Sequence, residues 1–340
     1  MKRICSKAPL RLGLAGGGTD VSPYSDLYGG AVMNATINMY AYCYIVPLEQ
    51  STISLESRDY NKYIEYPVSP ELPLDGTLDL FKSIYNRLIR QYRPELKGFR
   101  LVTFSDAPYG SGLGGSSTLV VAIIQCFAEW WKLPLGEYDI ATLAFEIERI
   151  EANLRGGKQD HYAATFGGMN FMEFFSDRVI VNPLRIKDSV INELEASLLL
   201  CFTGRSRESA HIIDSQIQNV QQRSDESVEA MHRLKIDAVE MKEAILTSQL
   251  DRFAEILDRS WINKKKMSVQ ISNPGIEELY VLAKENGAKA GKVSGAGGGG
   301  FMMFFADPLR RFKLKDSLSK NGFQLSDVSF SNRGVTSWIM

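Results

Sequence analysis

Three glycine-rich segments, far apart along the chain, constrain what this sequence can fold into more than any other feature. They are Gly16–Gly18, Gly110–Gly115 and Gly295–Gly300. Glycine loses more conformational freedom on folding than other residues, so clusters of it are typical of tight turns and of places where backbone approaches another group closely. We therefore use these three clusters as the main guides to the fold and to the site.

The central cluster lies in the segment Pro108–Thr118. A strand over 98–105 is predicted before it. A helix over about 116–131 is predicted after it, because Ser and Thr are good first-turn residues and no helix breaker follows. The backbone N–H groups of a glycine turn that leads into a helix N-terminus form a cradle for phosphate. The predicted nucleotide-binding residues are Pro108, Gly110, Ser111, Gly112, Leu113, Gly114, Gly115, Ser116 and Ser117.

Three other interpretations of this loop are weaker. A Walker A loop needs a Gly-Lys-Ser/Thr tripeptide, and the sequence has none. The spacing Gly110-x-Gly112-x-x-Gly115 matches a dinucleotide-binding fingerprint, but the acidic residue about 20 positions later, Glu129, falls inside the predicted helix. A turn that only tightens a joint between a strand and a helix would explain two glycines, but not four glycines with two serines. Phosphate binding is therefore favoured.

Two carboxylates, Glu148 and Asp160, stand on either side of Gly156-Gly157. A helix over about 135–154 is predicted to contain Glu148 and to end at these glycines, which leaves Asp160 in a loop. An Asp beside glycines is more often a turn or N-cap residue than a catalyst. The spacing nevertheless allows one carboxylate to bind a metal ion and the other to contact a substrate hydroxyl, if the chain folds back.

The third cluster, Lys292–Gly300, precedes a predicted apolar strand over 301–305. Four consecutive glycines could form a flexible linker, but a linker between a helix and a strand of a compact domain would be unusual. We expect close backbone packing against a ligand or against another glycine loop. Basic residues that could hold an anion are expected at the solvated surface by default; they are Arg155, Lys158, Arg205, Arg207 and Lys292.

Length and composition limit the class of protein. The 340 residues favour two domains, predicted as 1–183 and 184–340. The 39 Lys and Arg residues balance 40 Asp and Glu residues, which argues against a nucleic-acid or membrane-surface partner. The four cysteines are widely spaced, and the longest apolar runs fall far short of the ~20 residues of a membrane span. With no signal-peptide pattern at the N-terminus, we expect a cytoplasmic protein with reduced thiols.

The order of the motifs resembles that of the GHMP kinases, the small-molecule kinases named for galactokinase, homoserine kinase, mevalonate kinase and phosphomevalonate kinase. The matching segments are Ala8–Arg11, Gly16–Asp20, Pro108–Thr118, Gly157–Asp160 and Lys292–Gly300. The resemblance covers essentially the whole chain. It implies a two-domain α/β fold of the α+β type with the active site in the cleft between the domains, and it implies ATP and Mg²⁺ as cofactors.

The same resemblance assigns roles to individual residues. Asp160 would be the base or orienting carboxylate for the attacking hydroxyl, and Arg11 would stabilise charge on that oxygen or on the transferring phosphoryl group. Ser116 and Glu148 would bind Mg²⁺, with Ser117 as a competing candidate. The implied substrate-binding residues are Gly17, Gly18, Thr19, Asp20, Arg205, Gly297 and Gly298. Arg205 is the candidate for a substrate phosphate, because it lies between a strand end and a helix start.

Within the family, the sequences Gly-Gly-Gly-Thr-Asp at 16–20 and Gly-Gly-x-Gln-Asp at 156–160 look most like those of D-glycero-D-manno-heptose 7-phosphate kinases and the related fucokinase domains. The implied substrate is a small sugar phosphate, phosphorylated at its anomeric hydroxyl, and a homodimer is possible. His161 departs from the usual Gln, which we expect to leave phosphoryl transfer unchanged but to bear on the choice of sugar. The alternatives are a fucokinase-like enzyme, an inactive sugar-binding regulator and an NAD-dependent oxidoreductase.

Overall fold

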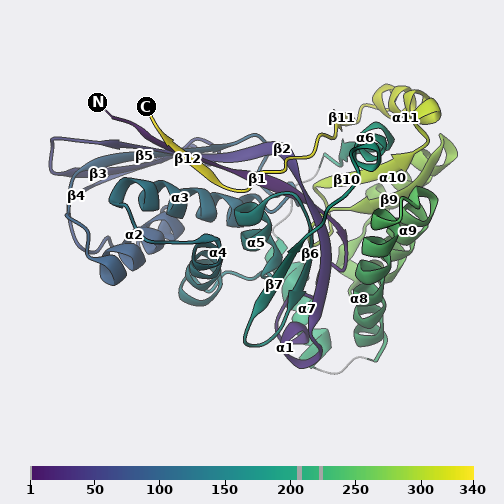
Figure 1. The fold of residues 1–340 in the computed structure, drawn as a ribbon, viewed down its shortest axis with the longest axis horizontal. Helices are drawn as coiled ribbons and strands as arrows, with labels where there is room; N and C mark the ends of the chain where they lie inside the picture. The colour runs from purple at the N-terminus through teal and green to yellow at the C-terminus, as the bar shows by residue number, and fades with distance from the viewer. Residues whose placement is uncertain (1, 205–208, 222–224) are drawn as a thin grey trace.

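A computed structural model of the chain describes residues 2–204, 209–221 and 225–340. The described strands form two sheets, one of eight strands and one of four. Figure 1 shows the larger sheet extending from the left-hand end to the centre of the molecule, with the smaller sheet and its helices at the right. The chain therefore has the mixed α/β architecture that the sequence predicts.

The larger sheet is organised around β2, an 18-residue strand. The second half of β2 pairs with β5, whereas its first half pairs with β6, and β1 runs antiparallel beside most of its length. The order is β12-β1-β2-β5-β3-β4, with β6 and β7 attached to β2. The strands are β1 (Ile4–Ala15), β2 (Gly30–Pro47), β3 (Thr52–Ser57), β4 (Lys62–Pro67), β5 (Phe99–Ser105), β6 (Met169–Phe174), β7 (Val179–Pro183) and β12 (Thr336–Ile339).

Helices cover one face of this sheet in Figure 1, where α2, α3, α4 and α5 lie together below its strands. The buried face of α3 is almost entirely apolar and packs on β1 and β2. The helical segments of this half are α1 (Tyr24–Tyr28), α2 (Asp79–Tyr92), α3 (Gly115–Trp131), α4 (Glu137–Phe145), the π-helical η1 (Glu146–Glu151) and α5 (Gln159–Phe166).

The second half of the chain builds the smaller sheet, in the order β11-β8-β10-β9. Its elements are α6 (Asp188–Ser197), β8 (Leu198–Phe202), α7 (Ser209–Gln221), α8 (Asp225–Leu246), α9 (Leu250–Lys265), the 3₁₀ segment η2 (Val269–Ile271), α10 (Pro274–Glu285), β9 (Ala288–Val293), β10 (Phe301–Ala306), α11 (Pro308–Lys320) and β11 (Gln324–Asp327). Residues 205–208, including Arg205, lie outside the described residues.

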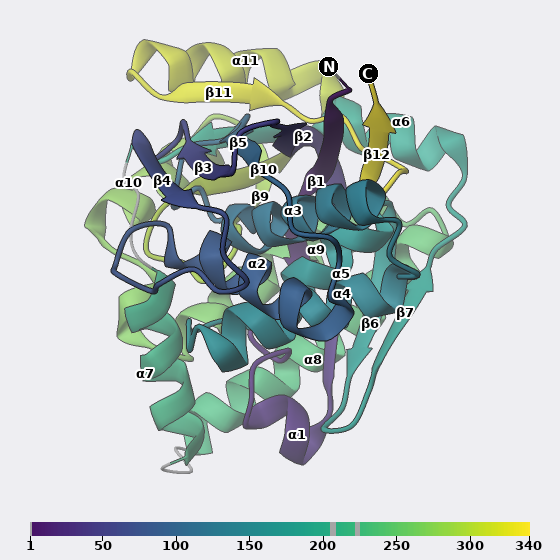
Figure 2. The same cartoon turned by 90° about the vertical axis from the view of Figure 1, so that its left-hand side faces the viewer.

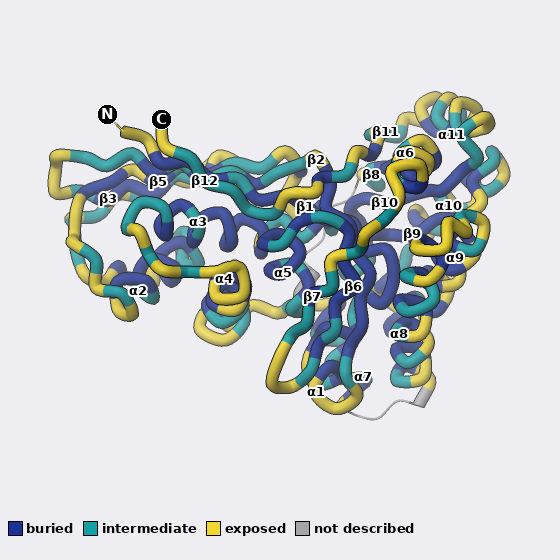
Figure 3. The backbone as a smooth tube through the Cα atoms, viewed as in Figure 1, coloured by how far each residue is buried: buried dark blue, intermediate teal, exposed yellow. Residues whose placement is uncertain are grey.

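One apolar core joins the two halves. Leu12 of β1 and Met33 of β2 share it with Met241 of α8, Phe253 of α9 and Met303 of β10, and all five side chains are buried. Because α3 covers the other face of β1 and β2, these strands are enclosed on both sides, as the dark central strands of Figure 3 show. Burial on both faces explains why β1 lacks the alternation of a half-exposed strand.

The last strand returns to the first sheet. In β12, Ile339 pairs with Ile4 and Thr336 pairs with Lys7 of β1, and Figure 2 shows the two chain ends side by side. The final residues of the predicted second domain therefore belong to the sheet of the first. The boundary near residue 184 stays a prediction.

Three local expectations were wrong. The helix expected over 135–154 is α4 followed by the wider π-helical turn η1, which contains Glu148. Asp160 lies in the first turn of helix α5 rather than in a loop. Lys292, expected at the surface, lies in strand β9 and is 1% exposed, because that strand is paired with β10 and buried.

The central and third glycine loops pack directly against each other, which confirms the close backbone contact expected for the third cluster. Phe301 N donates a hydrogen bond to Ser111 O at 2.8 Å. A Cβ on Gly112 would lie 2.5 Å from Ser294 O, and a Cβ on Gly300 would lie 2.4 Å from Ser111 O. Only glycine permits this approach, so the fold depends on both clusters at once.

The contact predicts a difference between two glycines with the same backbone angle. Gly300 and Gly322 both have φ of +84°, but a Cβ on Gly322 would meet nothing within 4 Å. Gly322→Ala should lower the free energy of unfolding by about 1–2 kcal/mol through left-handed backbone strain alone. Gly300→Ala should lower it by about 1–3 kcal/mol more, through the clash. Urea denaturation of both variants measures the difference, and equal losses would contradict the packing described.

Candidate active site

The central glycine loop forms one wall of a cleft with a volume of about 360 Å³. Gly110, Gly112 and Gly114 have positive φ values of 71°, 75° and 80°, which turn the loop into the N-terminus of α3. Eight of the nine predicted nucleotide-binding residues line this cavity. The ninth, Leu113, does not. Its side chain is buried in the core, and its carbonyl accepts a hydrogen bond from Arg11 N.

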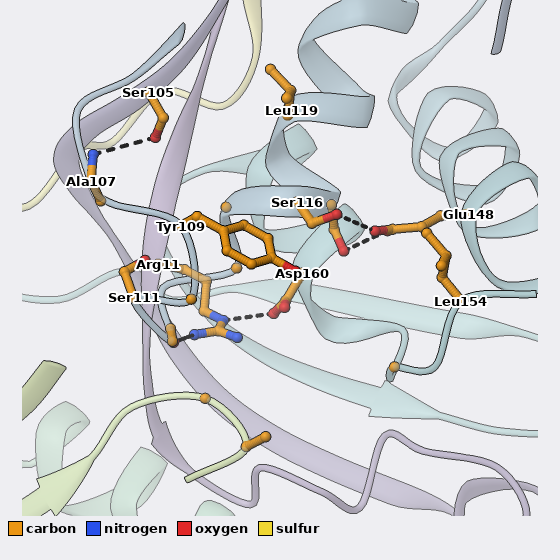
Figure 4. Close-up of a pocket in the computed structure, with 18 of the residues that line it drawn as sticks. Arg11, Ser105, Ala107, Tyr109, Ser111, Ser116, Leu119, Glu148, Leu154 and Asp160 are labelled. Carbon is orange, nitrogen blue, oxygen red and sulfur yellow. Dashed lines mark hydrogen bonds and ion pairs between the residues drawn. The ribbon is translucent and has the colours of Figure 1, made fainter. Parts of the chain in front are cut away.

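Arg11 of β1 links three segments of the site. Its Nε donates to Asp160 Oδ1 at 2.6 Å, and its Nη1 donates to Gly112 O at 2.7 Å. The same Nη1 lies 3.3 Å from Ser294 Oγ in the third loop. The guanidinium therefore fixes the two glycine loops and the predicted catalytic carboxylate relative to one another. Figure 4 shows this pairing of Arg11 with Asp160.

Glu148 receives hydrogen bonds from both serines at the start of α3. Ser116 Oγ donates to Glu148 Oε1 at 2.7 Å, and Ser117 Oγ donates to Glu148 Oε2 at 2.6 Å. Ser116 is exposed and Ser117 is buried. Ser116 and Glu148, the two residues that the resemblance assigns to Mg²⁺, are therefore in contact. Figure 4 shows the pair beside the central glycine loop, called the phosphate loop below after its expected ligand.

The carboxylate of Glu148 is held charged. His161 Nε2 lies 2.6 Å from its Oε2, and Arg149 Nη2 lies 3.3 Å from the same oxygen. Burial alone would raise the pKa of Glu148, but the charge of Arg149 and the hydrogen bonds from His161 and Ser117 outweigh burial and lower the pKa to about 2. Sequence reasoning missed this role of His161, which contacts Glu148 and does not line the cavity.

Asp160 is presented by the first turn of α5, and Asp20 holds that turn in place. Asp20 Oδ2 accepts a hydrogen bond from Gln159 N at 3.0 Å, while Asp20 Oδ1 accepts one from Gly18 N at 3.2 Å. A Cβ on Gly157 would lie 1.9 Å from Asp20 Oδ2. The backbone carbonyl of Asp20 also accepts a hydrogen bond from Lys158 N at 3.3 Å, so Asp20 ties the first glycine loop to the start of α5.

Three residues expected to bind substrate contact other parts of the protein and line neither of the two cavities at this site, so their role stays a prediction. Thr19 is fully buried, and its hydroxyl bonds to Gly16 O and Ala31 O. Gly298 N donates to Ile271 O, and a Cβ on Gly297 would lie 2.7 Å from the same oxygen. These contacts hold the first and third glycine loops against neighbouring backbone. The residues of the third loop that do line the cavities are Gly295 and Ala296.

A second, smaller cavity of about 70 Å³ continues from the first. Arg11 and Asp160 line both cavities, so they stand at the junction. The wall of the second cavity comes from the first loop, the start of α5 and helices α7 and α9; its polar members are Arg11, Asp20, Gln159, Asp160, Gln216, Lys264 and Lys292. Gly17 and Gly18 line it as well. We call it the acceptor cavity.

The donor set beside the phosphate loop suits a magnesium ion. Mg²⁺ is usually held by one or two protein oxygens and completed by phosphate and water, and Ser116 Oγ and Glu148 Oε1 are two such oxygens at the cavity wall. Among the described residues, no group of three or more His, Cys, Asp or Glu side chains could hold a metal ion by itself.

In that same part of the chain, no helix is long and apolar enough to cross a membrane.

Comparison with known proteins agrees with this geometry. The GHMP kinases N-terminal domain matches residues 79–168, and the GHMP kinases C-terminal domain matches residues 241–324. D-glycero-alpha-D-manno-heptose 7-phosphate kinase from Campylobacter jejuni is 51% identical over 99% of both chains. The chain belongs to the GHMP kinase family. It is an ATP-dependent small-molecule kinase, and the two-domain fold of that family is the one predicted.

Two solved structures are also similar along the whole chain. A protein described as a D-glycero-D-manno-heptose 1-phosphate kinase from Bacteroides thetaiotaomicron has a TM-score of 0.84 and 44% identity, with 98% of each chain covered. A putative sugar kinase from Campylobacter jejuni has a TM-score of 0.82 and 48% identity, with 100% of this chain and 99% of that chain covered.

The three-way contact of Arg11 predicts that lysine cannot replace it. A lysine ammonium lacks the planar fork that reaches Asp160 and Gly112 O together. Arg11→Lys should reduce kcat at least about 100-fold, and it should lower the free energy of unfolding by about 1–3 kcal/mol by leaving a buried acceptor unpaired. Arg100→Lys, at a half-exposed surface pair with Glu56, is the control and should change both quantities little. A fully active Arg11→Lys enzyme would contradict the role given to the guanidinium.

Proposed function

We propose that this kinase transfers the γ-phosphoryl group of ATP to the anomeric hydroxyl of D-glycero-D-manno-heptose 7-phosphate and forms the 1,7-bisphosphate. The observation that carries the proposal is the position of Arg11 and Asp160, which line both the cavity of the phosphate loop and the acceptor cavity. A donor phosphate in the first and an acceptor hydroxyl in the second would meet at this pair.

The reaction needs positioning and charge neutralisation more than covalent chemistry. The hydroxyl oxygen of the acceptor forms a bond to the γ-phosphorus, the bond from that phosphorus to the bridging oxygen of ADP breaks, and the hydroxyl proton passes to Asp160. One oxygen of Asp160 already accepts from Arg11, so Oδ2 is the oxygen that receives the proton. A carboxylate is a weak base, so Asp160 orients the hydroxyl and takes the proton late.

Other groups act on the phosphates. The N–H groups of the 110–115 turn and the N-terminus of α3 would hold them. Ser116 and Glu148 would hold Mg²⁺, which would neutralise charge on the β- and γ-phosphate oxygens. The lowered pKa of Glu148 keeps its carboxylate ionised for this role at neutral pH. Arg11 would stabilise negative charge that develops near the attacking oxygen.

The choice of sugar is supported by the similarity to the Campylobacter heptose 7-phosphate kinase, at 51% identity. The Bacteroides relative is described as a heptose 1-phosphate kinase. The two descriptions name different acceptors. We favour attack by the anomeric hydroxyl, which fits a step toward nucleotide-activated heptose for surface polysaccharide.

The role of Asp160 predicts a separation of binding from turnover. Asp160→Asn keeps the shape of the side chain and an oxygen for Arg11, but it removes the proton acceptor. We expect kcat to fall by about 10²–10⁴-fold while the Kd for ATP stays within a few-fold. Asp177→Asn, at an exposed pair with Arg178, is the matched control and should be unaffected. Turnover of Asp160→Asn within a few-fold of the parent would show that Asp160 serves only to shape the start of α5.

The acceptor is tested by measuring kcat/KM for four sugars with ATP and Mg²⁺: heptose 7-phosphate, heptose 1-phosphate, free heptose and L-fucose. The proposal predicts the highest value for heptose 7-phosphate, by at least about tenfold over free heptose, because a charge-assisted contact to the second phosphate adds about 1.5–3 kcal/mol. A preference for heptose 1-phosphate would reverse the assignment of the attacking hydroxyl. Equal values for free heptose and its 7-phosphate, or a preference for fucose, would favour a fucokinase-like enzyme.

A further inference from the structure

Two lysines are buried in the wall of the acceptor cavity. Lys264, near the end of α9, is 2% exposed, and Lys292 of β9 is 1% exposed. Each ammonium group donates to a backbone carbonyl, Lys264 to Gly295 O and Lys292 to Gly13 O. Among the side chains that the structure describes, no carboxylate oxygen lies within 4.0 Å of either ammonium. A buried cation without an ion-pair partner is costly in the free protein, unless its partner arrives with a ligand.

Lys264 is the lysine placed to meet such a ligand. Gly17 lines the same cavity, and a Cβ there would lie 3.5 Å from Lys264 Nζ. Because glycine has no side chain, the ammonium stays open to a ligand in the cavity. Burial lowers the pKa of Lys264, and the charge of Arg11 lowers it further. The more distant carboxylates of Asp20 and Asp160 oppose these effects, and the pKa is about 8. Lys264 is therefore still mostly protonated at neutral pH.

The rest of the wall also offers unpaired donors. Within the described part of the chain, the Nε2 atoms of Gln159 and Gln216 have no hydrogen-bond partner, and both residues are 4% exposed. Their residues line the acceptor cavity together with Lys264. A wall of unpaired N–H donors is complementary to a ligand rich in acceptor oxygens, and the ammonium adds a preference for negative charge.

We propose that Lys264 is a substrate-binding residue that holds an anionic oxygen of the acceptor. That oxygen belongs either to the phosphate group that the acceptor carries or to the attacking hydroxyl as it loses its proton. The proposal rests on the proposed function for the position of the acceptor. Lys265, the next residue on α9, is a natural contrast, because its ammonium is paired with Glu277 at 2.9 Å and does not line the cavity.

The experiment compares Lys264→Met with the control Lys265→Met. Methionine fills the space of the lysine stem without the charge, so the thermal midpoint of ligand-free Lys264→Met should equal or exceed that of the parent. With heptose 7-phosphate, Lys264→Met should raise KM or lower kcat by about 10- to 100-fold, the effect of losing a charged hydrogen bond. The KM for ATP should stay within twofold. Lys264→Arg should recover part of the loss, and Lys265→Met should match the parent.

A parallel assay with free heptose, which lacks the phosphate, shows which oxygen of the acceptor Lys264 holds. If Lys264 holds the acceptor phosphate, Lys264→Met will leave the kinetics of free heptose unchanged. If it holds the attacking oxygen, kcat will fall for both acceptors.

Two outcomes would overturn the proposal. One is kinetics within twofold of the parent for both acceptors. The other is a lower thermal midpoint with equal losses for ATP and acceptor, which would make Lys264 a structural tie to Gly295. If the parent itself fails to use heptose 7-phosphate, the proposed function fails, while the ligand-free thermal midpoint still tests whether this charge is kept at a cost to stability.

Discussion

The Arg11 guanidinium is the interaction on which the rest of the site depends. It extends from the most enclosed strand of the larger sheet and contacts the phosphate loop, the third glycine loop and Asp160. These three segments come from distant parts of the chain, and the shared core behind β1 keeps them in register. A planar group with several fixed donors suits this role, because it can satisfy acceptors on different segments at once.

The site contains two buried charged side chains of opposite sign, Glu148 beside the phosphate loop and Lys264 beside the acceptor cavity. Beside the phosphate loop, Glu148 is surrounded by donors and stays ionised, which favours a bound cation. On the acceptor side, the ammonium of Lys264 is buried against the carbonyl of Gly295, which favours a bound anion. In the proposed mechanism, the protein holds complementary charge for both substrates before either binds, an arrangement that would lower the reorganisation needed during transfer.

Sequence reasoning found what local patterns encode. The spacing of glycines and serines was enough to predict the strand, the loop and the helix over 98–131, and motif order identified the family. It could not find contacts that only tertiary structure creates. The burial of Lys292 depends on the pairing of β9 with β10, and the contact of Thr19 with Ala31 depends on β2. The π-helical turn that carries Glu148 has no distinctive pattern of apolar residues, so an ordinary helix was expected there.

A crystal structure with a non-hydrolysable ATP analogue, Mg²⁺ and heptose 7-phosphate would test the central claim most directly. We expect the γ-phosphate at the 110–116 loop, with the anomeric oxygen within about 3 Å of Asp160 Oδ2, the reach of a proton acceptor. It also predicts that the rest of the sugar occupies the cavity lined by Gly17 and Lys264. A sugar bound elsewhere, or an anomeric oxygen that makes no contact with Asp160, would contradict it.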